Sequence, residues 1–259
     1  MKNRFCILAI LLIAILSVSA GKNPGSTVYE WENLKVKNNT RGTVRNVLKS
    51  PTRSLGMFEI KAVTLKGGAL IKEYRVAKGY DEMLIIGEGT SKITINGKSE
   101  LLGEGSVVVA SQGDQVIISN EAKEDMTFYQ FRFRPRKNEN LAKNIRKADP
   151  VFRNWNDIEF RANANGGRRD IMRQPTALIK ELEIHTTQLK EGLPSHSSHV
   201  HPDEEIILIR YGRVEESING KPFQCGPGSV IFLTNDDDHG IRNAGQGPCE
   251  YYAIRWLTY

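Results

Sequence analysis

The residues best suited to chemistry in this chain are its five histidines, all of which lie at or after position 185. His199, His201 and Glu205 occur in the order His-x-His-x3-Glu, and His239 follows downstream. Alternate side chains of a strand lie on one face, so positions 199, 201 and 205 would converge if this segment is extended. Imidazole and carboxylate groups together suit one divalent transition metal, either Mn, Fe, Ni, Cu or Zn. We therefore predict one metal per chain, bound by these four residues, because burying them without a metal would be costly.

Further polar side chains near this motif are candidates for substrate contact or proton transfer. His196 lies just before the motif and is either a proton shuttle at the mouth of the site or an exposed loop histidine. Asp238 directly precedes the last histidine, where it could orient the imidazole, act as a base or simply be solvated. Tyr211 shares parity with Glu205 and should face the same interior, either to contact substrate or to fill the core. His185 is expected to be a solvated strand residue.

A tandem repeat organises the chain around these residues. Trp155 follows Trp31 by 124 positions, and Glu205 follows Glu82 by 123 positions. Further pairs follow the same spacings: Pro51 and Pro175, Tyr129 and Tyr252, Arg132 and Arg255. In the first copy, the positions of the three histidines are occupied by Val76, Lys78 and Val116. A lone glutamate cannot hold a transition metal with useful affinity, so the first copy is predicted to be metal-free.

Short apolar-rich runs bounded by Gly, Asn and Asp recur in both copies and predict an all-β fold. Asn96-Gly97 and Asn219-Gly220 are hairpin signals at equivalent positions. Many short strands with regular turns are typical of a sandwich or a small barrel. We expect two barrels, residues 27–136 and 153–259, joined by a polar linker at 137–152 that includes a short helix.

The first 20 residues resemble a secretory signal. Lys2 and Arg4 precede an apolar run at 5–16, and small residues at 18–20 offer a cleavage site. The alternative is an uncleaved N-terminal anchor, but the run is short for a membrane span. We expect a periplasmic or secreted protein that has no membrane attachment after cleavage.

Cleavage would remove Lys2 and Arg4 and lower the formal net charge from +6 to +4. The remaining basic residues are scattered, so nucleic acid is not an expected partner. The expected partner is a small-molecule substrate, and a homodimer is compatible with the sequence. Cys225 and Cys249 are either buried thiols or a disulfide pair.

The second copy resembles the cupin superfamily in both of that family's motifs. The first motif is carried by Gly192, His199, His201, Glu205 and Gly212, with one extra residue after Gly192. The second motif keeps its spacing from Gly228 to His239 and Asn243, although Thr234 and Asp236 replace the usual Pro and Gly. The turn before His239 is therefore expected to differ in shape.

This resemblance implies a bicupin, that is, two tandem RmlC-like jelly-roll barrels, with a metal motif only in the C-terminal one. The metal would act as a Lewis acid in an exported enzyme for a small oxygenated metabolite, such as a sugar acid or other carboxylate. Isomerase, hydrolase, decarboxylase and dioxygenase chemistry all remain open. The alternatives are a non-catalytic sugar- or carboxylate-binding cupin with a structural metal, and an iron or copper dioxygenase.

Overall fold

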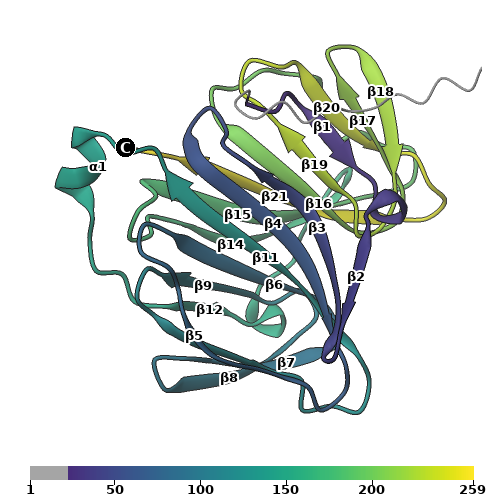
Figure 1. Ribbon diagram of the computed structural model, residues 1–259. Coiled ribbons are helices and arrows are strands. Elements are labelled where there is room, and N and C mark those ends of the chain that lie inside the picture. The colour runs from purple at the N-terminus through teal and green to yellow at the C-terminus, as the bar shows by residue number, and fades with distance from the viewer. Residues whose placement is uncertain (1–22) are drawn as a thin grey trace, which may run out of the picture.

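The computed structural model describes residues 23–259, which form an almost entirely β structure (Figure 1). The predicted signal segment, residues 1–20, lies outside the described residues. Within the described part of the chain, α1 (Glu139–Asn144) is the single α-helix, and no helix is long and apolar enough to cross a membrane. The predicted all-β, jelly-roll fold class is confirmed.

The first unit is built from two antiparallel sheets. Its strands are β2 (Val36–Asn39), β3 (Gly42–Ser50), β4 (Leu55–Leu65), β5 (Leu70–Arg75), β6 (Asp81–Glu88), β7 (Thr90–Ile95), β8 (Lys98–Gly103), β9 (Val107–Ser111), β10 (Gln115–Ser119) and β11 (Met126–Pro135). Six of them form a large sheet in the order β9-β6-β11-β4-β3-β2, and the others form a small sheet in the order β5-β10-β7-β8. An apolar cluster with members from both sheets fills the space between them.

The second unit repeats this arrangement. Its strands are β13 (Arg161–Asn163), β14 (Gly166–Gln174), β15 (Glu181–Leu189), β16 (Glu204–Tyr211), β17 (Val214–Ile218), β18 (Lys221–Cys225), β19 (Val230–Leu233), β20 (His239–Asn243) and β21 (Cys249–Leu257). The large sheet has the order β19-β16-β21-β15-β14-β13, and the small sheet has the order β18-β17-β20. The small sheet has one strand fewer because residues 190–203, the counterpart of the β5 region, form a loop with isolated bridges.

Strand register shows that the sequence repeat is also a structural repeat. Glu82 on β6 lies opposite Arg132 on β11, and Glu205 on β16 lies opposite Arg255 on β21. Both hairpin asparagines predicted from the sequence, Asn96 and its counterpart, have positive φ, as does the glycine after each. The two copies therefore place equivalent residues on equivalent strands.

The units exchange their edge strands, which differs from the predicted division of the chain. β1 (Thr27–Tyr29) pairs with β19 of the second unit, although residue 27 was expected to begin the first barrel. Conversely, β12 (Val151–Arg153), which spans the predicted boundary at 152–153, pairs with β9 of the first unit (Figure 1). Each large sheet thereby gains a seventh strand from the segment that precedes the other unit.

The two units also share one hydrophobic core. Phe58 and Phe133 of the first unit pack against Trp256 of the second, with ring centroids 4.9 and 5.5 Å from the indole. The hydroxyl of Tyr252 donates a hydrogen bond of 2.8 Å to the carbonyl of Gly105 in the other unit. Its repeat partner Tyr129 bonds Gly228 in the same way at 3.3 Å. Residues shared by both copies thus hold the copies together.

The buried inter-unit hydrogen bond of Tyr252 supports a prediction about stability. Tyr252→Phe should lower the free energy of unfolding by about 1 kcal/mol, because the Gly105 carbonyl loses its side-chain donor in a buried interface. Tyr129→Phe should cost less, because its bond is longer. Chemical denaturation of both variants measures the difference, and equal stability of Tyr252→Phe and the wild type would contradict the prediction.

The linker contains the predicted short helix, and both cysteines are buried thiols. α1 lies within residues 137–152, and its Leu141 is buried against Ala177 and Leu178. Cys225 and Cys249 are both free and buried, so the buried-thiol interpretation is the one that the structure supports. Burial raises the pKa of the Cys225 thiol to about 12 and that of Cys249 to about 11.

Candidate metal centre

The histidines of the motif lie on a loop rather than on the predicted strand. His199 and His201 fall between β15 and β16, whereas Glu205 is on β16 and His239 begins β20. His199 and His239 form an isolated antiparallel bridge with two backbone hydrogen bonds of 3.0 Å. This bridge keeps the loop extended locally, so the convergence expected from strand parity still occurs.

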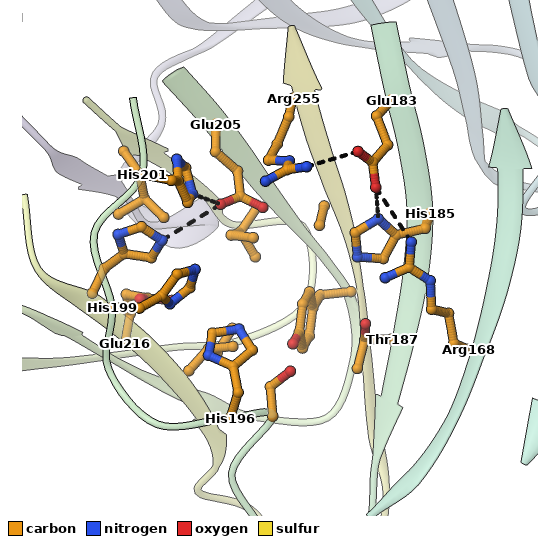
Figure 2. Close-up of a pocket in the computed structure, with 17 residues that line it drawn as sticks. Arg168, Glu183, His185, Thr187, His196, His199, His201, Glu205, Glu216 and Arg255 are labelled. Carbon is orange, nitrogen blue, oxygen red and sulfur yellow. Dashed lines mark hydrogen bonds and ion pairs between the residues drawn. The ribbon is translucent and has the colours of Figure 1, made fainter. Parts of the chain in front are cut away.

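The four predicted ligands lie close together. One ring nitrogen from each of His199, His201 and His239 lies within 4.8 Å of the others. The Oε2 atom of Glu205 is 3.1 Å from Nε2 of His201 and 3.6 Å from Nε2 of His239 (Figure 2). The three imidazoles and the carboxylate therefore surround a common point, as a metal site requires.

Two backbone carbonyls orient the imidazoles. Nδ1 of His201 donates to the carbonyl of Asp203 at 3.0 Å, and Nδ1 of His239 donates to the carbonyl of Asp237 at 2.9 Å. These bonds leave both Nε2 atoms without a proton in the neutral rings, as metal ligation requires. Nε2 of His239 is buried and lacks a hydrogen-bond partner. An orphaned imidazole nitrogen beside two histidines and a carboxylate fits a transition metal.

Charge within the cluster favours metal binding as well. Burial alone would raise the pKa of Glu205, but the adjacent His201 and His239 lower it to about 2. Burial and the neighbouring histidines lower the pKa of His199. Burial also opposes protonation of His239, but Glu205 and the Asp237 carbonyl outweigh it and raise its pKa. Glu205 is therefore ionised, and protons compete with a cation for His239.

This competition predicts that metal affinity falls on acidification. Each imidazole must lose its proton to bind, so affinity should fall about tenfold per pH unit for each protonated histidine below its pKa. Since the pKa of His239 is raised, the loss should begin above the ordinary histidine value of about 6.5. Competition with a chelator at pH 8, 6.5 and 5 measures it, and equal affinity at pH 8 and pH 5 would contradict it.

A cavity of about 210 Å³ opens beside the histidines. The side of the cavity away from them is lined by side chains of β14, β15 and β21 (Figure 2). There Arg255 donates to Glu183 at 2.7 Å, and Arg168 donates to the same carboxylate at 3.3 Å. Nδ1 of His185 lies 3.5 Å from Glu183, whose pKa is lowered by His185 first and then by Arg255. This wall places the guanidinium of Arg168 and the imidazole of His185 across the cavity from the histidine cluster, whereas Arg255 lies beside Glu205, its partner on the neighbouring strand (Figure 2).

His185 corrects a prediction. It was expected to be solvated, but its side chain is only 13% exposed and lines the cavity. Its repeat partner Lys61 had suggested an exposed strand position. Arg168 and Glu183 were not singled out from the sequence, because neither residue type nor spacing marks them.

The three predicted catalytic residues have different outcomes. His196 lines the cavity, and its ring centroid lies 4.4 Å from that of His199. Tyr211 does not line the cavity; its hydroxyl instead accepts a hydrogen bond from Gln188 at 2.6 Å. The register of β16 shifts between Ile209 and Tyr211, so the parity counted from Glu205 no longer applies.

Asp238 does not line the cavity either. Its backbone pairs with Asn219, and it is the carbonyl of Asp237, not the Asp238 carboxylate, that orients His239. The turn before His239 was expected to differ from the family pattern. Asp236 has a φ of 71°, in the same left-handed region as Gly113 at the equivalent position, so the turn keeps this feature without glycine.

Glu216 on β17 is the main cavity residue that the sequence reasoning missed. It is 1% exposed, lines the cavity, and has no hydrogen-bond partner for either carboxylate oxygen. Burial raises its pKa to about 8, although the nearby His239 opposes the shift, and Glu205 adds to it. A signal was present: Glu216 interrupts the apolar alternation of Val214 and Ile218, and the repeat places Ile93 at the same position in the first unit.

The equivalent place in the first unit is filled by side chains. The hydroxyl of Tyr74 donates to Glu82, which is 2% exposed, and Arg132 lies 3.6 Å from the same carboxylate. Val76 and Val116 are buried in the apolar cluster. Val116 pairs with Tyr74 rather than with Val76, so this segment does not follow the register of the histidine loop.

Together these features define an all-β jelly-roll protein with a histidine cluster beside a polar cavity. Residues 185–255 match the protein-family model described as Cupin domain. The matched residues lie in the second unit, which contains the histidine cluster. No curated protein sequence is significantly similar to this chain.

Several solved structures share the fold over nearly the whole chain. An oxalate decarboxylase from Lactobacillus farciminis, in complex with formate, superposes with a TM-score of 0.70 at 14% identity, covering 93% of this chain and 88% of that one. Ylba from E. coli gives 0.70 at 16% identity, covering 93% and 95%. A protein from Pseudomonas aeruginosa described as glyoxylate-induced gives 0.71 at 13% identity, covering 94% and 92%. At these identities the similarity establishes the fold alone.

Proposed function

We propose that this protein is an exported, metal-dependent bicupin enzyme that acts on a small oxygenated carboxylate, with its activity confined to the second unit. The observation that carries the proposal is the Nε2 atom of His239, which is buried and has no hydrogen-bond partner. It lies close to His199, His201 and Glu205, beside a cavity. A filled structural site has no need of an adjoining cavity, whereas a catalytic site leaves a position open to substrate.

The chain's own residues have distinct tasks in this proposal. His199, His201, His239 and Glu205 would hold the metal, which would supply Lewis-acid stabilisation of negative charge on a substrate oxygen. Arg168 lies across the cavity and Arg255 lies beside Glu205, and both would attract the anionic end of the substrate. The exposed His196 would hold a proton at the cavity mouth.

The first unit would serve a structural role. Its Phe58 and Phe133 pack against Trp256 of the second unit. Its strand β9 also pairs with β12, the segment that precedes the second unit. Its buried Glu82 is satisfied by Tyr74 and Arg132, which leaves it no free group for a ligand. Location outside the cytoplasm rests on the signal-like residues 1–20.

The metal content of protein purified without residues 1–20 tests the proposal first. We expect about one divalent transition metal per chain, followed by turnover of at least one compound in a screen of uronates, hydroxy acids and keto acids. Tight binding without turnover would favour the second candidate, a carboxylate-binding cupin. Absence of metal after incubation with Mn, Fe, Ni, Cu and Zn would overturn both.

A further inference from the structure

Glu216 occupies a position at which the fold does not require a carboxyl group. Its neighbours on the same face of β17, Val214 and Ile218, are 0% and 7% exposed and belong to the apolar cluster of the second unit. The repeat places Ile93 at the equivalent position of β7, where it is fully buried in an apolar cluster. The same barrel is therefore completed by an aliphatic side chain in one copy and by a carboxyl group in the other.

Keeping the carboxyl group there costs stability. Both oxygens of Glu216 are buried and lack a hydrogen-bond partner, and a buried polar group without a partner costs roughly 1–3 kcal/mol. No cationic side chain forms an ion pair with Glu216 in the described part of the chain. Glu216 instead lines the cavity that contains the histidine cluster. A costly group of this kind in the wall of a cavity indicates a partner from outside the chain.

The chemistry of that partner follows from the surroundings of Glu216. A carboxyl group retains acceptor oxygens in either protonation state, so it can always receive a hydroxyl or amine donor. Glu205 lies in the same cavity wall, so an anionic group is disfavoured near Glu216 by like charge. The guanidinium group of Arg168 lines the opposite wall (Figure 2). The side of the cavity that contains Glu216 therefore favours a hydrogen-bond donor of the ligand, and the opposite side favours an anionic group.

We infer that Glu216 binds a hydroxyl group of the ligand, so that the site selects small hydroxy carboxylates over carboxylates without the hydroxyl. This inference rests on the proposed function for the carboxylate and the metal, and it adds the second recognition element. The cavity of about 210 Å³ restricts the ligand to a small molecule.

The test compares lactate with propionate, which lacks the hydroxyl group, by calorimetric titration of Mn²⁺-loaded protein without residues 1–20. The wild type should bind lactate more tightly, and Glu216→Ile should reduce the ratio of the two dissociation constants about tenfold, the equivalent of about 1.4 kcal/mol. Chelation of the metal by lactate contributes equally in both proteins, so it cancels from the comparison. Glu216→Gln, whose carbonyl still accepts, should retain part of the preference.

Two controls separate recognition from damage to the fold. Glu215→Gln alters the adjacent carboxylate, which bonds Gln224 on the neighbouring strand, and should leave the ratio unchanged. Glu216→Ile should retain the metal and raise the unfolding temperature of the metal-free protein, because it removes an unpartnered buried carboxyl group. A lower unfolding temperature would show that the carboxyl group is structural and would overturn the inference.

The remaining outcomes distinguish failure of hydroxyl recognition by Glu216 from failure of the proposed function. An unchanged ratio in metal-loaded Glu216→Ile would overturn hydroxyl recognition while leaving the proposed function intact. Tighter binding of lactate than of propionate without turnover of any compound would support the inference but contradict the proposed enzymatic activity. Failure of the wild type to bind either acid would overturn the inference together with the carboxylate class of substrate.

Discussion

Replacing His201 with alanine is expected to remove most of the bound metal from the protein. His201 presents Nε2 to the cluster, 3.1 Å from Glu205, while its Nδ1 is fixed by the Asp203 carbonyl. Loss of a residue that merely orients a ligand costs about 10–100-fold in metal affinity, so loss of a ligand should cost at least the upper end of that range. Metal analysis after dialysis against a weak chelator measures the change.

His196→Ala is the matched control, because His196 is a neighbouring histidine outside the cluster of three. It should retain metal at the wild-type stoichiometry. The double variant His199→Ala/His201→Ala sharpens the test, since it leaves only His239 and Glu205. Stoichiometric metal in the double variant would disprove the assignment of these ligands.

Glu205→Ala is expected to lower activity by orders of magnitude, whereas Glu82→Ala should change it only a few-fold. The two glutamates occupy the same strand position in their units, opposite Arg255 and Arg132 respectively. Only Glu205 lies beside imidazoles, so only its loss disturbs the group that would supply Lewis-acid chemistry. Initial rates on a substrate from the screen measure both effects.

The controls for this comparison concern folding and metal content. Glu82→Ala removes a buried carboxylate that accepts from Tyr74, so it should destabilise the first unit even where activity persists. The exposed Lys78 offers a milder change in the same unit, and Lys78→Ala should leave rates within a few-fold. An active Glu205→Ala protein would show that assigning the site to the second unit is wrong. A folded and metal-loaded Glu82→Ala protein without activity would show the same.

The sequence by itself determined the repeat, the all-β fold class and the hairpin turns. These features are local or periodic: strand alternation follows from backbone geometry, and turns such as Asn96-Gly97 follow from the positive φ that both residues adopt. The sequence also identified His199, His201, Glu205 and His239 as a group, because residue type and spacing suffice to predict convergence on an extended chain. Their role as metal ligands remains a prediction.

The tertiary structure decided what periodicity cannot express. Alternation assigns a side chain to a face but does not specify which other strand that face meets, so Arg168 and His185 emerged as cavity residues only in the folded chain. A register shift inside β16 removed Tyr211 from the predicted interior. The exchange of β1 and β12 between sheets depends on pairing across more than 40 residues of intervening chain, and the partnerless state of Glu216 depends on every group that packs around it. Such long-range contacts are set by how whole sheets close on each other, and no local pattern in the sequence records them.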